Sequence, residues 1–145
     1  MPRESVSTRA HRCLRRLQRF TRGTEVLSLA RVPSELEKAL REGEAIVGAY
    51  QNTEPRGGEL LVLTEEAVLV ESSSGHFERI PFTSIARVET PESKQLDSLQ
   101  IDLTSGEARI LRVLGGGGET RDVFAFLRFF DRVLADLTTV DESHQ

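Results

Sequence analysis

The sequence has a single cysteine, and it lacks the run of about 18 apolar residues that a transmembrane helix needs. Because a disulfide needs two cysteines, Cys13 fits a reducing compartment, where we expect it to act as a small apolar side chain. The first 30 residues also lack the uninterrupted apolar stretch of a secretory signal. These absences predict a soluble, cytoplasmic protein, and the length of 145 residues predicts one main domain.

Acidic residues are scarce at the N-terminus and abundant elsewhere. Residues 1–31 contain eight arginines and two glutamates, a net charge of +6, whereas residues 32–145 have a net charge of −10. The basic character is therefore confined to an N-terminal arm, residues 1–32. Since an acidic main domain repels phosphate groups, we expect no broad binding to nucleic acid.

An amphipathic pattern occupies residues 6–22. Apolar side chains recur there at spacings of three and four residues, the period of an α-helix; they are Val6, Ala10, Cys13, Leu14, Leu17 and Phe20. Six arginines lie between them: Arg9, Arg12, Arg15, Arg16, Arg19 and Arg22. The pattern predicts a basic amphipathic helix that ends at Gly23, because glycine readily adopts the left-handed conformation of a helix C-cap.

Several roles are open for this helix. Its apolar stripe could pack on the rest of the chain or on a partner, and its arginines could instead contact an anionic membrane or RNA. The stripe lacks tryptophan and has one aromatic residue, Phe20, which weakens the membrane role. The arginine-rich, acid-poor composition also fits a transit peptide.

The middle of the chain changes from a helical period to a period of two. Ser34 and Glu37 fit a capping box, and Gly43 fits a C-cap, so we expect a short helix over 34–42. Seven short β-branched or aliphatic runs follow, separated by turn residues; they span 44–52, 58–64, 66–73, 76–82, 84–90, 97–104 and 107–114. Links of hairpin length predict one antiparallel meander.

A strong helical pattern ends the sequence at about 120–137. Seven apolar side chains fall within one core-facing arc; they are Val123, Phe126, Leu127, Phe130, Val133, Leu134 and Leu137. Phe124 and Phe129 lie outside this arc on opposite flanks. The N-terminal helix could cover them, or they could form an interface with a partner or a second copy. Residues 139–145 are expected to form a disordered tail.

The sequence of residues 58–89 resembles bacterial pleckstrin-homology-like and GRAM-like domains. Those domains show a strand ending in Leu-Thr, a glycine turn, and an Ile-Pro-aromatic segment leading into Val-Glu; the matching positions are Leu63, Thr64, Gly75, Ile80, Pro81, Phe82, Ile85, Val88 and Glu89. The resemblance covers about residues 35–137. It implies an α+β, mainly β fold, in which a C-terminal helix caps a seven-stranded antiparallel barrel. The domain would span 33–138, after the N-terminal arm.

The resemblance also implies a non-enzymatic module that acts through protein contacts or self-assembly. Members that bind phosphoinositides present several cations in the loop between their first two strands. The corresponding loop, residues 51–58, offers Arg56 beside Glu54, which argues against phosphoinositide binding there.

Four glycines, Gly115 to Gly118, precede the last helix. A Walker loop needs a lysine after its last glycine and a dinucleotide loop needs a glycine at position 120, which is Thr120, so neither motif fits. Glu119 and Asp122 would also repel an anion at this helix start. We interpret the glycines as a hinge, whose replacement by alanine would change stability without removing a binding activity.

Catalytic side chains are sparse elsewhere. The histidines, His11, His76 and His144, show no zinc-ligand spacing, and Ser72 to Ser74 fit a hairpin turn. We therefore predict no catalytic residue, no metal site and no cofactor.

The leading hypothesis is a scaffold that binds a protein partner, or a second copy of itself, through the C-terminal helix and the N-terminal arm. Its interface residues would be Phe124, Phe129, Leu14, Leu17 and Phe20. The alternative is a peripheral membrane module, in which anionic lipid contacts Arg9, Arg12, Arg15, Arg16, Arg19 and Arg22.

Overall fold

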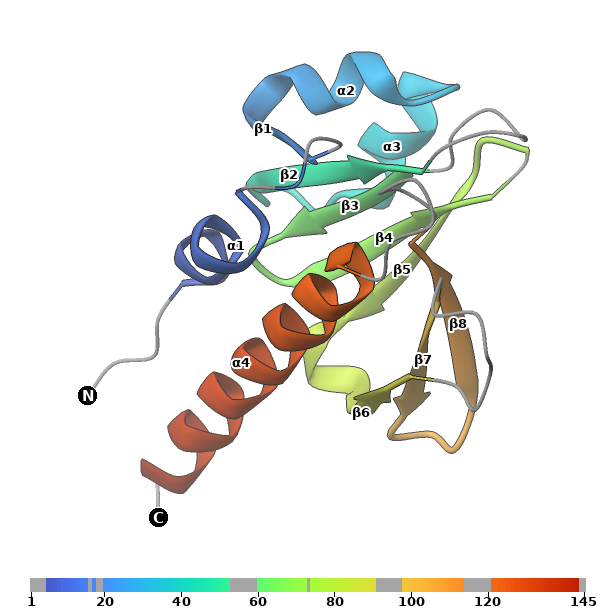
Figure 1. The fold of residues 1–145 in the computed structure, drawn as a ribbon. Coiled ribbons are helices and arrows are strands. Elements are labelled where there is room, and N and C mark those ends of the chain that lie inside the picture. Colours follow the sequence, from blue (N-terminus) through green and yellow to red (C-terminus); the bar gives the residue numbers. More distant parts are fainter. Residues whose placement is uncertain are drawn as a thin grey trace.

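The fold is α+β and consists mainly of β-strands. The computed structural model describes residues 5–15, 17, 20–52, 60–72, 74–90, 98–113 and 121–143. Within these residues, eight strands form two antiparallel sheets, and a long C-terminal helix follows them (Figure 1).

Consecutive strands pair in both sheets. The first sheet contains β1 (Phe20–Arg22), β2 (Ile46–Gln51), β3 (Leu60–Thr64), β4 (Ala67–Glu71) and β5 (Phe77–Pro81) in spatial order. The second contains β6 (Ile85–Glu89), β7 (Ser98–Leu103) and β8 (Ala108–Arg112). Each of the seven predicted runs contains one strand, so the predicted strands are confirmed. They form neither one continuous meander nor a closed barrel, because the 3₁₀ turn η2 (Phe82–Ser84) separates β5 from β6 and the described strands make two sheets; the predicted seven-stranded barrel is therefore not confirmed.

The N-terminal segment is shorter as a helix than its pattern predicts. Helix α1 spans Val6–Leu14, and the predicted continuation to residue 22 is wrong because residues 20–22 pair with β2 as strand β1. Phe20 lies opposite Tyr50 and Arg22 opposite Gly48. Long-range pairing therefore overrides the helical period of this segment.

Two short helices follow β1. Gly23 has a positive φ of 82°, and it begins the 3₁₀ turn η1 (Gly23–Glu25) rather than capping α1. Helix α2 spans Val26–Leu29, and α3 spans Pro33–Ala39. The predicted capping box is wrong: Pro33 occupies the first helical turn, Val32 is the N-cap, and no side chain caps the helix.

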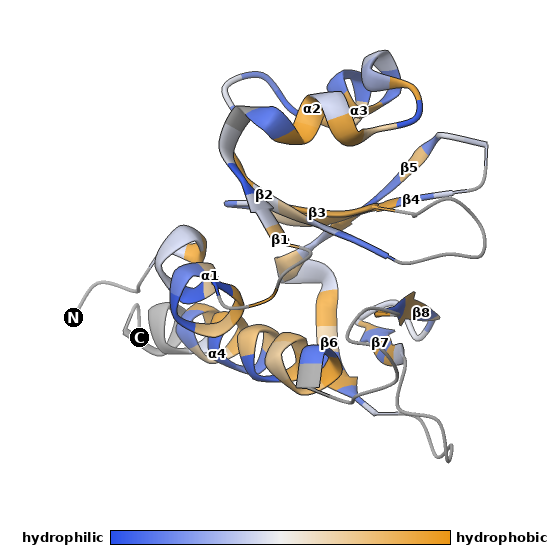
Figure 2. Cartoon of the chain, turned by 45° about the horizontal axis from the view of Figure 1, so that its top comes forward, coloured by the Kyte–Doolittle hydropathy of each residue, from blue (hydrophilic) through white to orange (hydrophobic). Residues whose placement is uncertain are grey.

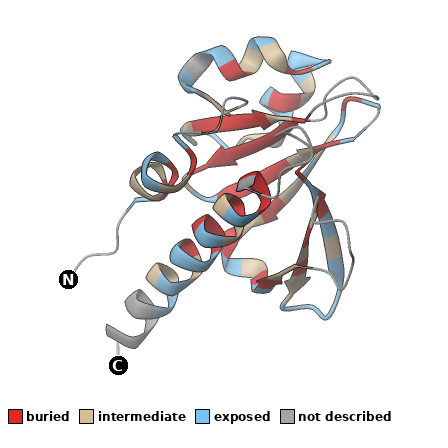
Figure 3. Cartoon of the chain, viewed as in Figure 1, coloured by how far each residue is buried: buried red, intermediate tan, exposed pale blue. Residues whose placement is uncertain are grey.

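The five-stranded sheet is covered on both faces. Helices α2 and α3 lie on one side of it, and α1 and α4 lie on the other (Figure 2). Alternate residues of β3 enter different cores: Leu60 and Val62 pack with residues of α2 and α3, whereas Leu61 and Leu63 belong to the cluster of α1 and α4. Every residue of β3 is therefore buried (Figure 3).

Helix α4 spans Arg121–Ser143, so it continues beyond the predicted end at 137 and includes most of the segment predicted as a tail. Its inner face carries Phe126, Phe129 and Phe130, which are fully buried. Phe129 is therefore a core residue, although its position in the helical pattern placed it outside the core-facing arc. At the start of α4, the buried Tyr50 hydroxyl donates a 2.6 Å hydrogen bond to Asp122 Oδ2.

The two predicted parts of the chain share their cores. Val6, Ala10 and Leu14 of α1 belong to the same cluster as the phenylalanines of α4, and Val26 packs with Leu36 across the predicted boundary at residue 32. Folding of 33–138 as a separate domain stays a prediction.

Candidate functional site

Helix α1 is attached to the rest of the chain at its first turn. Both oxygens of the Glu65 carboxylate accept 2.9 Å hydrogen bonds, one from the amide of Val6 and one from the amide of Ser7. The first amides of a helix have no partner within it, and the helix dipole favours a negative charge at this end. Glu65, in the turn between β3 and β4, therefore holds α1 in place through its N-terminus.

A second attachment joins α1 to α4. The Arg9 guanidinium donates two 2.8 Å hydrogen bonds to the two carboxylate oxygens of Asp136. Both side chains are mostly buried, so this ion pair is less exposed to screening by salt than a surface pair. The two attachments fix which surfaces of α1 and α4 lie together.

Basic side chains from both helices surround Cys13. Burial raises the pKa of the Cys13 thiol above its ordinary value, while the charges of Arg128, Arg9, Arg132 and Arg12 lower it in part. Arg12, Arg128 and Arg132 are exposed. The protein thus gathers cations from α4 beside those of the N-terminal segment.

A groove on α4 includes two of these cations, Arg128 and Arg132. Its volume is about 500 Å³, and it is lined by Phe124, Leu127, Arg128, Asp131, Arg132 and Ala135. The Phe124 side chain is 46 % exposed, although it is a large hydrophobic residue. We use the name α1–α4 face for the surface made by Arg12 and the residues that line this groove, Asp131 included.

The predicted interface residues fall into different environments. Phe129 and Leu14 are fully buried, so both belong to the core of the chain. Leu17 and Phe20 are partly buried and pack against that core. Phe124 is the member of the predicted set that lies exposed, and its contact with a partner stays a prediction.

The arginines predicted to contact lipid are also divided. Arg9 is mostly buried in its ion pair with Asp136. Arg12, Arg15 and Arg22 are exposed, and the last two lie beside His11, with Arg22 Nη1 2.8 Å from His11 Nδ1. Arg16 and Arg19 lie outside the described residues.

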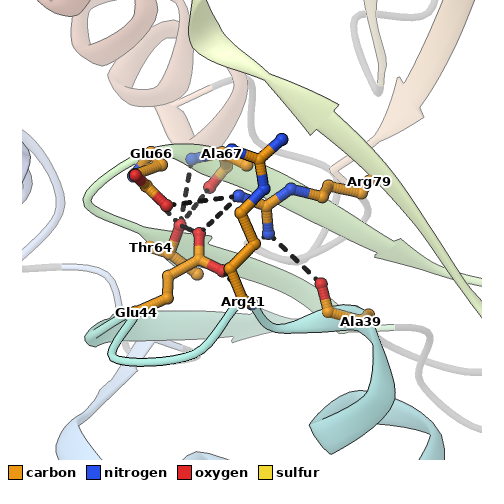
Figure 4. A network of polar contacts seen from close by, with 7 residues as sticks. All are labelled: Ala39, Arg41, Glu44, Thr64, Glu66, Ala67 and Arg79. Atoms are coloured by element: carbon orange, nitrogen blue, oxygen red, sulfur yellow. Dashed lines mark hydrogen bonds and ion pairs between the residues drawn. The ribbon is translucent and has the colours of Figure 1, made fainter.

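A buried ion pair joins β5 to the segment that precedes β2. Arg79 of β5 donates to both carboxylate oxygens of Glu44, at 2.6 and 2.8 Å, and Thr64 Oγ1 donates to Glu44 Oε2 at 2.6 Å (Figure 4). The Glu44 side chain is fully buried. Burial alone would raise its pKa, but hydrogen bonds from Arg79, Thr64 and the Arg41 amide lower the pKa of Glu44 to about 2.

A cleft of about 550 Å³ lies beside this ion pair. Its apolar lining comes from Val6, Pro81, Phe82, Val133 and Leu137, and its charged lining from Arg41, Glu65, Glu66, Arg79 and Asp136. The cleft therefore brings together residues from α1, α4, β5, η2 and the turns before β2 and after β3.

The remaining sequence candidates have local partners. His76 Nδ1 lies 2.8 Å from Glu35 Oε2, and Ser72 Oγ lies 2.8 Å from Ser74 Oγ within a turn. Ser73, His144, Arg56 with its loop, and Gly115 to Gly118 fall outside the described residues. Among the described side chains, no group of His, Cys, Asp and Glu is suited to hold a metal ion. No helix in the described part of the chain has the length and apolar character needed to cross a membrane.

Sequence reasoning did not identify Arg128, Arg132 or Arg41 as candidates. Arg128 and Arg132 follow Phe124 at intervals of four residues, so their shared helix face was visible in the sequence. Their relation to Arg12 depends on the packing of α1 against α4, which the sequence analysis left as one of several open roles of the N-terminal helix. Comparisons of the chain with protein-family models, curated proteins and solved structures found no match.

Proposed function

We propose that the chain is a non-enzymatic interaction module of the pleckstrin-homology-like type, and that it binds an acidic segment of a protein partner on the α1–α4 face. The order of elements supports the fold assignment: β2 to β8 are seven consecutive strands, antiparallel within each of the two sheets, and one long helix follows. Strand β1 is an addition beside β2. Arg109 of β8 donates a 2.7 Å hydrogen bond to Glu78 of β5, which supports a barrel-like curl of the two sheets toward each other.

One observation carries the binding proposal: the exposed Phe124 shares a groove with Arg128 and Arg132 of α4, and these two arginines act on the same thiol, that of Cys13, as Arg12 of α1. Aromatic residues and arginine are enriched where proteins bind one another, and Phe124 with Arg128 and Arg132 provides both types on one groove. Neither of these arginines makes an ion pair with a described residue. The face carries three arginines and one acidic residue, Asp131, so carboxylates of an acidic partner would supply the complementary charge.

The burial of α1 favours this proposal over the membrane alternative. A helix that lies on a bilayer inserts its apolar face among the acyl chains. The apolar side chains of α1, including Val6, Ala10 and Leu14, are buried in the core of the chain. A lipid-bound α1 would first have to detach from α4 and from Glu65.

Affinity capture with matched variants tests the proposal. F124S and R128E, both on the α1–α4 face, should weaken capture of the partner about tenfold or more, because loss of an aromatic anchor typically costs about 2 kcal/mol. I110S is the control, since Ile110 of β8 is 54 % exposed and lies on another surface. Light scattering at several concentrations reports whether the partner is a second copy.

Equal capture by F124S, R128E and I110S would refute the proposed face. Co-sedimentation with anionic vesicles, if it is lost on adding salt or on replacing Arg12 and Arg15 by glutamine, would instead favour the membrane module.

A further inference from the structure

The cleft beside Glu44 has the size of a ligand site. Its volume of about 550 Å³ falls within the range of about 300–1,000 Å³ that is typical of small-molecule pockets. Part of its lining is apolar, with Pro81 and Leu137 only partly buried, and the rest of the lining, named the charged wall, carries Arg41, Glu65, Glu66, Arg79 and Asp136. A ligand that fills it would need an apolar part and a polar part.

Most charged groups of the cleft are already paired within the protein. Glu65 accepts from two amides of α1, Asp136 accepts from Arg9, and Arg79 donates to Glu44. Apart from these pairs, the charged lining contains Arg41 and Glu66, whose side chains can still form contacts with a ligand.

Hydrogen-bond donors on the charged wall lack an acceptor. The exposed Arg41 guanidinium makes no hydrogen bond or ion pair with any described residue. The Nε donor of Arg79 also has no partner among the described residues, but it is buried and so does not face a ligand in the cleft. Guanidinium groups bind carboxylates through paired, charge-assisted hydrogen bonds. The exposed guanidinium of Arg41 can thus bind one carboxylate group.

We propose that this cleft binds a small molecule that carries a single carboxylate on an apolar body. Arg41 binds the carboxylate, and the apolar body lies against Phe82, Val133 and Leu137. Glu66 lies on the same lining, 55 % exposed and 3.4 Å from Arg79 Nη2, so its charge opposes ligands with more than one negative group, such as phosphate esters.

Titration of the full chain with octanoate tests this inference. Octylammonium has the same alkyl tail and the opposite charge, so it separates recognition of the carboxylate from burial of the tail. In an ¹H–¹⁵N correlation spectrum, we expect octanoate, and not octylammonium, to shift amide signals of Thr83 and Leu137. By calorimetry, R41Q should weaken octanoate binding about tenfold, because a hydrogen bond to a charged group is lost. R112Q, at an exposed arginine of β8 outside the cleft, should bind like wild type.

Several results would overturn the inference. These are no octanoate binding, equal binding of octylammonium, equal affinities of R41Q and R112Q, or amide shifts confined to residues away from the cleft. F124S should leave octanoate binding unchanged, because Phe124 does not line this cleft. The inference therefore stands or falls separately from the proposed partner surface.

Discussion

Replacing Glu44 by glutamine tests the energetic role of the buried ion pair. The change removes the negative charge and leaves the Arg79 guanidinium, which is 18 % exposed, without its bidentate partner. Breaking a buried ion pair from one side costs about 3–5 kcal/mol, and the partial exposure of Arg79 puts this case at the lower limit. We expect E44Q to lower the free energy of unfolding by about 3 kcal/mol at pH 7.

The pKa of Glu44 gives an independent magnitude and a pH dependence. Its value in the folded chain is about 2, below the ordinary value of 4.5. The stabilisation is therefore complete above about pH 4.5 and is lost as the pH falls toward 2. A difference of about 2.5 between the two pKa values corresponds to at most about 3 kcal/mol, in agreement with the estimate from the ion pair.

Urea denaturation followed by circular dichroism, at pH 7 and at pH 3, measures both effects. The difference in stability between wild type and E44Q should narrow by about 2 kcal/mol at pH 3. At that pH Glu44 is mostly protonated in the unfolded chain, whereas in the folded chain it stays mostly ionised, because its pKa there is about 2. D102N is a control: Asp102 accepts from Arg87 on the surface, where an ion pair contributes little. An E44Q protein as stable as wild type at pH 7, or a difference that stays constant with pH, would refute this reasoning.

Three other substitutions test the contacts that position α1, α4 and β1. E65Q removes the charge at the α1 N-terminus and should cost about 1 kcal/mol, with faster hydrogen exchange at the first amides of that helix; unchanged exchange would count against the role of Glu65. Y50F deletes the buried hydrogen bond to Asp122 and should lower stability in thermal unfolding by about 1–2 kcal/mol, whereas a neutral result would mean that this contact is not formed. G48A places a methyl group 2.7 Å from the Thr21 carbonyl oxygen, so we expect the free energy of unfolding measured in urea to fall by about 1–3 kcal/mol and the amide signals of β1 to shift. A stable variant with unshifted β1 signals would show that β1 does not lie this close to Gly48.

The strands were predictable because their signals are local. Alternation such as that of Leu99 and Ile101 needs no knowledge of the partner strand, and both residues are fully buried in β7. Strand β1 was not predictable by this route. Its three residues continue the helical spacing of α1, and they become a strand by pairing with β2, where Gly48 lets the backbone of Thr21 approach closely. Pairing with β2, a contact between residues distant in the sequence, therefore decided whether residues 20–22 form helix or strand.

The candidate sites were predictable only in part for the same reason. Phe124 was identified because its position outside the apolar arc is a property of one helix. Its basic neighbours come from α1 as well as α4, and the cleft around Arg41 takes its lining from five separate stretches of chain. Nothing in the spacing of single residues indicates that such stretches meet.

The five-stranded sheet has consequences for where recognition can occur. With helices against both of its broad sides, the residues of β3 and most of those of β2 and β4 are fully or nearly shut off from solvent. Any ligand or partner that leaves the fold intact must therefore bind at the outer sides of the helices, at the ends of the strands or at the turns. Substitutions in these central strands would change the stability of the fold, whereas substitutions at the outer surfaces would change binding specificity.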